Sequence, residues 1–378
     1  MIFIKSFSLW SFLWDPDLFI FESSFFSLRW YSVLFAIGFV IGRFIVVRSY
    51  KLENGYDLTV DLQMVYMVIG ILMGSRIGHI LFYEPSLLNK NFFELFFFWQ
   101  SGLASHGAAV GIILSMGFYS YYIHKEGFFF RLKDRLRRGY NYYQVMDRMI
   151  IAVALGCSLI RIGNFINSEI IGKPTERNYG VIFTKPVENQ IKNQLPFVKE
   201  ITFTETGQFQ KEGRPILKTS IIFKNELYME SRIRKSIKKS LGFILPVNTH
   251  VGSHVINPLG SKVEHSFVRT PNSFELHLET VGIYRHPSQI YEAITYGFIW
   301  LLIYFIYNKH RKKLRPGSLF GLFLITIFPA RFLLEFFKEN QVAFENNLYL
   351  NMGQFLSIPL FLYGIYVFFR NLTHNRLF

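Results

Sequence analysis

Three arginines and one histidine are prominent in this sequence because each lies within or beside a long apolar stretch: Arg76, His106, Arg161 and Arg331. A charged side chain at bilayer depth is costly and usually faces a cavity or another charge. Arginine forms bidentate hydrogen bonds to phosphate oxygens, and a neutral imidazole can take a proton from a nucleophile. These residue types therefore indicate a site for a phosphodiester headgroup, with or without catalysis.

Other polar residues accompany these four at helical spacing. Arg331 and Glu335 are four residues apart and share a helix face, and Arg161 and Asn164, three apart, do likewise. For any one residue an ion pair between helices, or a cap, is an equally good explanation. Taken together, the set favours a ligand site. The other candidate binding residues are Tyr31, Glu169, His286, Ser288, Gln289, Glu292 and Gln354.

The elements that must position these residues are apolar segments. The chain of 378 residues is 51% hydrophobic and contains 43 Phe and 21 Tyr, more large apolar side chains than one aqueous core buries. Crossing a bilayer takes about 20 residues. The sequence thus predicts an all-α polytopic membrane protein of about seven transmembrane helices with an inserted β-rich domain. The seven stretches are roughly 29–47, 60–83, 93–123, 146–163, 289–307, 318–337 and 352–369.

Two of these segments call for comment. The stretch 93–123 is too long for one simple span, so we expect its first part to be an interfacial or re-entrant arm. Gly70, Gly74 and Gly78 recur at helical spacing and predict a helix surface that lets a neighbouring helix approach closely. The N-terminal segment before the first span has no small-residue cleavage site and is expected to lie on the membrane.

Charge sets the expected orientation. The net charge of +15 is carried by short basic clusters between apolar runs, which indicates cytoplasmic anchoring and not nucleic-acid binding. Residues 125–138 and 309–315 hold such clusters, so the N-terminus is predicted outside and the C-terminus in the cytoplasm. All the candidate residues then lie at the outer ends of their spans. Cys157 is the only cysteine, which excludes a disulfide framework and a cysteine zinc site.

The division expected from this pattern is 1–172 for the first four spans, 173–285 for an extracytoplasmic insertion and 286–378 for the last three spans. Alternation of period two in 274–279 predicts a strand in the insertion. Residues 232–241 form either an amphipathic helix on anionic lipid or a solvated basic face. His250 and His254 only weakly suggest a metal site, since no carboxylate or thiol partner lies nearby.

The motifs that carry these residues resemble the bacterial prolipoprotein diacylglyceryl transferase family. They occur in the family's order across essentially the whole membrane portion, and the long arginine motif and His-Pro-Ser-Gln are specific when found together. The motifs are Leu28-Arg29-Trp30-Tyr31, Gly74-Ser75-Arg76-Ile77-Gly78, Ser105-His106-Gly107, Arg161-Ile162-Gly163-Asn164-Phe165-Ile166-Asn167-Ser168-Glu169, His286-Pro287-Ser288-Gln289-Ile290-Tyr291-Glu292, Arg331-Phe332-Leu333-Leu334-Glu335 and Met352-Gly353-Gln354.

The resemblance implies a seven-helix inner-membrane enzyme with its active site on the extracytoplasmic side. Such an enzyme moves the diacylglyceryl group of phosphatidylglycerol to the lipobox cysteine thiol of a preprolipoprotein and releases glycerol phosphate. His106 would be the base, although an arginine field could itself lower the pKa of the thiol. Arg161 and Arg331 would bind phosphate. No metal or organic cofactor is required. The implied orienting residues are Tyr31, Asn164 and Glu335, and Glu169, Gly172 and Glu292 match family positions without firm roles.

The sequence also departs from the family pattern. Ala108 and Ala109 replace glycines common after the histidine, Ser168 replaces a usual glycine, and Lys338 stands where arginine is frequent. The outer insertion, at about 110 residues, is larger than is usual for the family. Its position beside the fourth and fifth spans suggests that it gates or docks the preprolipoprotein.

Two other functions use the same residues. A transporter or lipid scramblase could use the arginines as a headgroup path, but it should show polar residues through the membrane midplane and often internal repeats. Apart from Arg43, the polar residues stop at one end, and no repeat is evident. A catalytically dead, lipid-binding scaffold is disfavoured because His106, Arg161 and Arg331 are all present.

Overall fold

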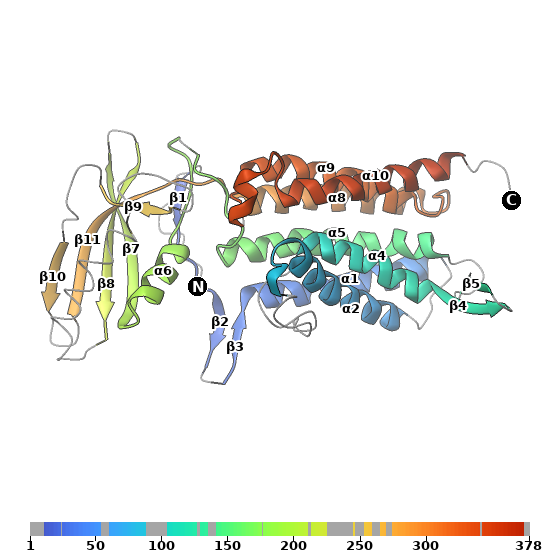
Figure 1. Cartoon of the computed structure of the whole chain (residues 1–378), viewed down its shortest axis with the longest axis horizontal. Helices are drawn as coiled ribbons and strands as arrows, with labels where there is room; N and C mark the ends of the chain where they lie inside the picture. Colours follow the sequence, from blue (N-terminus) through green and yellow to red (C-terminus); the bar gives the residue numbers. More distant parts are fainter. Residues whose placement is uncertain are drawn as a thin grey trace. The chain divides into compact units, whose positions relative to one another are not determined.

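A computed structural model describes residues 11–23, 25–53, 60–87, 104–126, 129–134, 141–175, 177–210, 213–224, 245, 253–258, 265–269, 274–340 and 342–373. The chain forms two compact units, which we describe separately. One comprises residues 1–31, 163–290 and 337–339 and contains most of the strands. The other comprises 32–162, 291–336 and 340–378 and is mostly helical. Figure 1 labels the elements of both.

The helical unit is built from long apolar helices, three of which (α1, α5 and α8) have one end in the other unit. Among the described residues, six helices are long and apolar enough to cross a membrane, as in a multi-pass membrane protein. The expected third span, 93–123, is not among these six, because α4 (Ser105–Ser120) has 16 residues and β4 begins at Tyr121. The expected arm before it lies largely outside the described residues. The six helices are α1 (Trp30–Leu52), α2 (Val60–Phe82), α5 (Tyr142–Ile166), α8 (Ser288–His310), α9 (Ser318–Leu334) and α10 (Met352–Thr373).

Glycines let α2 and α4 pack closely, as the sequence predicts. A methyl group added at Gly78 would lie 2.7 Å from Cα of Gly107, and one at Gly74 would lie 2.8 Å from Cα of Gly111. Neither distance is compatible with a side chain, so the two backbones are in contact at these positions. The N-terminal end of α4, which carries His106, is thereby held against α2.

A buried carboxylate fixes the start of α9. Asp147 of α5 accepts hydrogen bonds from the backbone N–H groups of Gly317, at 2.6 Å, and Phe320, at 2.9 Å. These N–H groups have no partner within the helix, so the carboxylate caps α9 from a neighbouring helix. The remaining elements of this unit are the hairpin β4 (Tyr121–Glu126) and β5 (Phe129–Asp134) and two short 3₁₀ helices, η2 (Glu335–Phe337, ending in the other unit) and η3 (Ala343–Asn347).

The second unit contains a five-stranded sheet in the order β10-β11-β8-β7, with β9 beside β11. Side chains of β8 alternate between buried and partly exposed, so Leu217, Thr219 and Ile221 face a core that α6 also lines. The segment 232–241 and His250 lie outside the described residues. The elements are β6 (Gly180–Phe183), α6 (Lys185–Gln194), β7 (Val198–Phe209), β8 (Pro215–Phe223), β9 (Val255–Ile256), β10 (His265–Arg269) and β11 (Phe274–Gly282).

The N-terminal residues contribute strands to this same unit. β1 (Ser11–Trp14) pairs in parallel with β6, with Ser11 opposite Gly180 and Trp14 opposite Phe183. The Trp14 indole N–H donates to the carbonyl of Phe165 at 3.0 Å. The segment expected to lie on the membrane is therefore folded in part into a β-layer. β2 (Phe19–Glu22) and β3 (Ser27–Arg29) form an antiparallel hairpin immediately before α1.

Candidate active site

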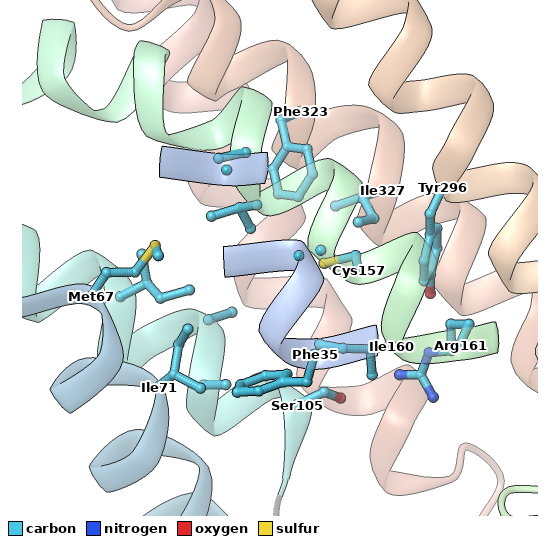
Figure 2. A pocket seen from close by; sticks show the side chains of 18 of the residues that line it. Phe35, Met67, Ile71, Ser105, Cys157, Ile160, Arg161, Tyr296, Phe323 and Ile327 are labelled. Carbon is cyan, nitrogen blue, oxygen red and sulfur yellow. The ribbon is translucent and has the colours of Figure 1, made fainter. Parts of the chain in front are cut away.

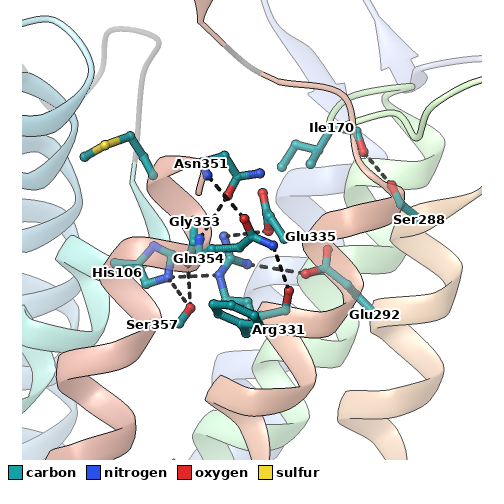
Figure 3. Close-up of polar contacts among 12 residues, drawn as sticks. His106, Ile170, Ser288, Glu292, Arg331, Glu335, Asn351, Gly353, Gln354 and Ser357 are labelled. Atoms are coloured by element: carbon teal, nitrogen blue, oxygen red, sulfur yellow. Dashed lines mark hydrogen bonds and ion pairs between the residues drawn. The ribbon is translucent and has the colours of Figure 1, made fainter. Parts of the chain in front are cut away.

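In the helical unit, one carboxylate joins the two arginines that the sequence singled out. Glu292 of α8 is fully buried, and its Oε2 lies 3.3 Å from Nε of Arg161 while its Oε1 lies 3.3 Å from Nη1 of Arg331. The hydroxyl of Tyr296, one turn along α8, donates to the same Oε1 at 2.8 Å. One negative charge thus holds two guanidinium groups, from α5 and α9, in one cluster. Figure 3 shows the Arg331 side of it, with Glu292 and His106.

The imidazole of His106 belongs to this cluster. Nε of Arg331 donates to Nε2 of His106 at 3.0 Å, and the Ser357 hydroxyl lies 3.2 Å from the same nitrogen. The guanidinium N–H can only donate, so Nε2 accepts and the ring is neutral with its proton on Nδ1. The structure therefore brings together His106, Arg161 and Arg331, which the sequence could only assign to the same side of the membrane.

Glu335 and Gln354 lie at the end of the same cluster. Glu335 Oε2 is 3.8 Å from Nη2 of Arg331. Gln354 lies in the first turn of α10. Its backbone N–H and side chain exchange hydrogen bonds with Asn351, at 2.9 and 3.2 Å, and its side-chain amide donates to the Phe332 carbonyl at 3.5 Å. A methyl group at Gly353 would lie 2.6 Å from the Glu335 carboxyl carbon, so any larger residue there would displace this carboxylate.

A cavity of about 190 Å³ opens beside these polar groups within the helical unit. His106, Arg161 and Arg331 contribute to its lining, and nearly all the other walls are apolar. Figure 2 shows Arg161 and Tyr296 together at one end, with Met67 and Ile71 on the far side. A cationic end and apolar walls suit an amphipathic anion, whose charged group would meet the guanidiniums. Arg76 is buried in α2 and is not among the described residues that line the cavity.

The remaining predicted residues form a second group in the strand-rich unit. Asn164 and Asn167 donate to the two carboxylate oxygens of Glu169, at 3.2 and 3.3 Å. The amide of Gln289 donates to the Glu169 carbonyl at 2.6 Å, and the Ser288 hydroxyl donates to the Ile170 carbonyl at 2.9 Å. The turn that follows α5, around Glu169 and Ile170, is thus held by side chains from the start of α8.

This turn contains two residues in the left-handed region. Ser168 has φ 53° and Ile170 has φ 56°, a conformation that favours glycine. The usual family glycine at position 168 is therefore explained by the backbone. The ring of Tyr31 packs closely against Gly163, a few residues before this turn, since a methyl group added at Gly163 would lie 2.8 Å from the ring.

Gly172 and His286 are adjacent, and a buried arginine that the sequence analysis did not select holds them. The Gly172 N–H donates to the His286 carbonyl at 3.2 Å. Arg285 is fully buried and donates to the Ser253 carbonyl through Nε and Nη2, at 2.9 and 2.6 Å, and to the Gly172 carbonyl at 2.8 Å. Its third partner is Glu339, at 3.0 Å. Burial lowers the pKa of His286, so this imidazole favours its neutral form.

Tyr296 and Ser357 were also missed. A signal for each existed in the spacing, because Tyr296 follows Glu292 by four residues and Ser357 follows Gln354 by three. Of the two histidines considered as metal ligands, His254 is buried and His250 lies outside the described residues. Within the described residues, no group of three or more metal-ligating side chains is found.

Known proteins resemble this chain over nearly its whole length. A family model described as prolipoprotein diacylglyceryl transferase matches residues 18–370. A phosphatidylglycerol–prolipoprotein diacylglyceryl transferase from Bacteroides fragilis is 28% identical over 368 residues, covering 94% of both chains. The protein of the same name from Chloroherpeton thalassium is 27% identical over 364 residues and 96% of both chains. That from Tolumonas auensis is 27% identical, covering 93% of this chain and 94% of its own.

Proposed function

We propose, because the chain belongs to the prolipoprotein diacylglyceryl transferase family, that it transfers the diacylglyceryl group of phosphatidylglycerol to the lipobox cysteine of a preprolipoprotein. The products would be a thioether-linked lipoprotein precursor and glycerol phosphate. The family and the names of the relatives support a transferase that acts on phosphatidylglycerol. The acceptor thiol and the released product are our proposal.

The observation that carries this proposal is the composition of the cavity. Its apolar walls suit the acyl chains of a phospholipid, and Arg161 and Arg331 line it together with His106. Each arginine can give a phosphate two N–H donors in one plane. Glu292 is shared by the two guanidiniums, and Glu335 also faces Arg331, at 3.8 Å. A bound phosphate would therefore compete with these carboxylates for the N–H donors of the two arginines.

The proposed reaction is a substitution at the diacylglyceryl carbon that bears the phosphate oxygen. The cysteine sulfur forms a bond to this carbon, the carbon–oxygen bond breaks, and its electron pair leaves with glycerol phosphate. Arg161 and Arg331 would stabilise the charge that develops on the leaving oxygen. The thiol proton would pass to Nε2 of His106. The lone pair of this nitrogen accepts a hydrogen bond from Arg331 and becomes available when Arg331 binds the phosphate instead.

The other predicted residues are proposed to position these groups. Glu335 would orient Arg331, which it faces at 3.8 Å. Tyr31 and Asn164 would orient the headgroup, as the family resemblance implies. Substrate-binding roles are proposed for Arg76, Glu169, Gly172, His286, Ser288, Gln289, Glu292 and Gln354.

The proposed location is the bacterial inner membrane, with the N-terminus outside and the C-terminus in the cytoplasm. In this proposal α4 completes a set of seven spans, residues 173–285 form an extracytoplasmic insertion, and the site opens to the extracytoplasmic side. The insertion would gate or dock the preprolipoprotein. A variant without it that kept the acceptor affinity and turnover of the full chain would contradict this role.

The test of the reaction uses purified protein, phosphatidylglycerol labelled in its headgroup glycerol, and a lipobox peptide with or without its cysteine. We expect release of labelled glycerol phosphate only with the cysteine-containing peptide. The release should disappear in Arg161→Ala and His106→Ala while circular dichroism and thermal melting stay those of a folded protein. Well-folded wild-type protein that releases no product would contradict the proposed function.

A further inference from the structure

The β2–β3 hairpin carries four large apolar side chains that are exposed. Ile20 is 42% exposed, Phe21 56%, Phe25 99% and Phe26 58%. They occur within seven residues, on strand β2 and on the turn that joins it to β3. Several large exposed apolar side chains this close together in the chain indicate an interaction site, whereas single exposed apolar residues do not.

Polar groups of the turn are hydrogen-bonded to one another. The Ser23 N–H donates to the Phe26 carbonyl at 2.9 Å, and the Phe26 N–H donates to the Ser23 hydroxyl oxygen at 3.2 Å. The same hydroxyl donates to the Phe26 carbonyl at 3.1 Å. Because polar groups that lose water without a partner are costly, these internal bonds remove much of the penalty for moving the turn into an apolar medium.

The chain connects this hairpin directly to a membrane-spanning helix. β3 ends at Arg29 and α1 begins at Trp30, so Phe25 is only five residues from the helix. Five residues extend over at most roughly 18 Å. The tip therefore cannot be far from the bilayer surface at which α1 starts. Trp30 and Tyr31 are residue types that concentrate at such surfaces.

Two charged residues limit how deeply the hairpin could enter a membrane. The guanidinium of Arg29 lies 5.2 Å from the ring centre of Phe19, at the base of the hairpin, where it can face lipid phosphates. Glu22 is exposed and lies opposite Ser27 in the ladder. With a carboxylate so near its tip, the hairpin would not reach the hydrocarbon centre of the bilayer. Insertion of about 5–10 Å, to the boundary of headgroups and acyl chains, agrees with this charge.

We propose that the β2–β3 hairpin is an interfacial membrane anchor, with Ile20, Phe21, Phe25 and Phe26 inserted in the leaflet at which α1 begins. This inference is independent of the proposed chemistry. The driving force is burial of apolar surface, so the anchor should insert in vesicles of phosphatidylcholine alone as well as in vesicles that also contain phosphatidylglycerol.

The test compares two exposed phenylalanines in hairpins. Phe25→Cys and Phe209→Cys are made in a Cys157→Ser background, labelled with a nitroxide and reconstituted in both vesicle types. Phe209 is a matched control, because it is 61% exposed near the tip of the β7–β8 hairpin. We expect the ratio of oxygen to nickel-chelate accessibility to be several-fold higher at position 25 than at position 209, with either lipid composition.

Three results would overturn the proposal. Equal ratios at the two positions would place the hairpin in water, and low accessibility to both probes at position 25 would indicate a protein contact, such as a second copy of the chain. Insertion only with phosphatidylglycerol would indicate electrostatic attachment through Arg29. If Cys157→Ser does not fold, Phe25→Trp and Phe209→Trp in the native chain, with lipids brominated in the acyl chains, give the same comparison. The unsubstituted chain, with its five native tryptophans, sets the background, and only Phe25→Trp should add quenching above it.

Discussion

Arg331 and His106 are bonded to each other, with Nε of the arginine 3.0 Å from Nε2 of the imidazole. A proposed phosphate binder thus occupies the lone pair of the proposed base. Binding of a phosphate to Arg331 would offer this guanidinium a charged acceptor, which is a stronger partner than a neutral imidazole. Binding of the lipid and release of the base would then be the same event, and a cysteine thiol would not be deprotonated before the donor lipid is in place.

Arg331→Lys tests this coupling. Lysine keeps the charge but cannot donate to His106 and to a phosphate from one rigid plane. We expect kcat/KM for phosphatidylglycerol to fall about 100-fold, equivalent to about 2.7 kcal/mol. The matched control is Arg370→Lys. Arg370 lies in the last turn of α10, away from the site, and contacts Tyr143. The activity of this variant should stay near that of the wild type. Comparable losses in both variants would contradict the role of Arg331.

Glu292→Gln removes the one negative charge between Arg161 and Arg331. The two guanidiniums would remain buried and repel each other, because the carboxylate that they share is fully buried. Loss of one partner from a buried ion pair costs about 3 kcal/mol. We expect a lower melting temperature together with lost turnover, whereas Glu279→Gln, on the exposed side of β11, should change neither. A stable and active Glu292→Gln protein would show that this carboxylate does not organise the site.

Gly353→Ala tests the close contact of α10 with Glu335. The new methyl group would lie 2.6 Å from the carboxyl carbon, so the carboxylate must move and its interaction with Arg331 must weaken. We expect about tenfold lower kcat and a destabilisation of about 1–3 kcal/mol, as for other overpacked positions. Gly117→Ala is the control, since nothing lies within 4 Å of its added methyl group. Activity assays and melting curves of the two variants decide the matter.

Ser168→Gly should stabilise the protein. Ser168 has φ 53°, and its buried hydroxyl has no hydrogen-bond partner among the described residues. A left-handed conformation costs a non-glycine residue about 1–2 kcal/mol, part of which is offset by the greater freedom of glycine in the unfolded chain. A net gain of about 1 kcal/mol is expected and would appear as a higher melting temperature. An unchanged or lower value would mean that the backbone at this turn is not strained.

His254 should make the strand-rich unit sensitive to acid. Burial, with a smaller contribution from the charge of Arg285, lowers the pKa of His254 from 6.5 to about 3. Between these values the unfolded state binds a proton that the folded state does not, so stability falls as the pH is lowered, by up to about 1.4 kcal/mol per pH unit. Above pH 6.5 the effect is absent. Melting temperatures measured across this range should depend less on pH in His254→Gln, and identical profiles would contradict the prediction.

The sequence predicted much of the helical part and of the polar cluster. Apolar length located six of the described helices, and the family identified from the motifs is confirmed by the match over residues 18–370. The spacing of glycines predicted a packed helix surface on α2, which the contact with Gly107 and Gly111 of α4 confirms. These features are local, since each depends on residues within one helix.

What the sequence could not provide depends on contacts between distant residues. The charge pattern of the loops predicted Arg161 and Arg331 at the same side of the membrane. Nothing in the sequence indicated that Glu292 would bridge them or that Arg331 would bond to His106. The expected third span was too long because apolar residues continue past Ser120 into β4. Hydropathy does not distinguish aromatic residues of a strand from those of a helix, so the predicted end of this span, at residue 123, lies beyond the end of α4 at Ser120.

The pairing of β1 with β6 has a consequence for how the chain is made. Ser11–Trp14 find their partners at Gly180–Phe183, and α1, α2, α4 and α5 lie between them in the sequence. Asp15 and Thr184, which are hydrogen-bonded beside this pair, are separated by 169 residues. A ribosome needs roughly 10–30 s to make that length. The first strand therefore remains without β6 while at least these four described helices are made and inserted into the membrane. The assembly of the strand-rich unit is in this way timed by the insertion of the helices that precede it.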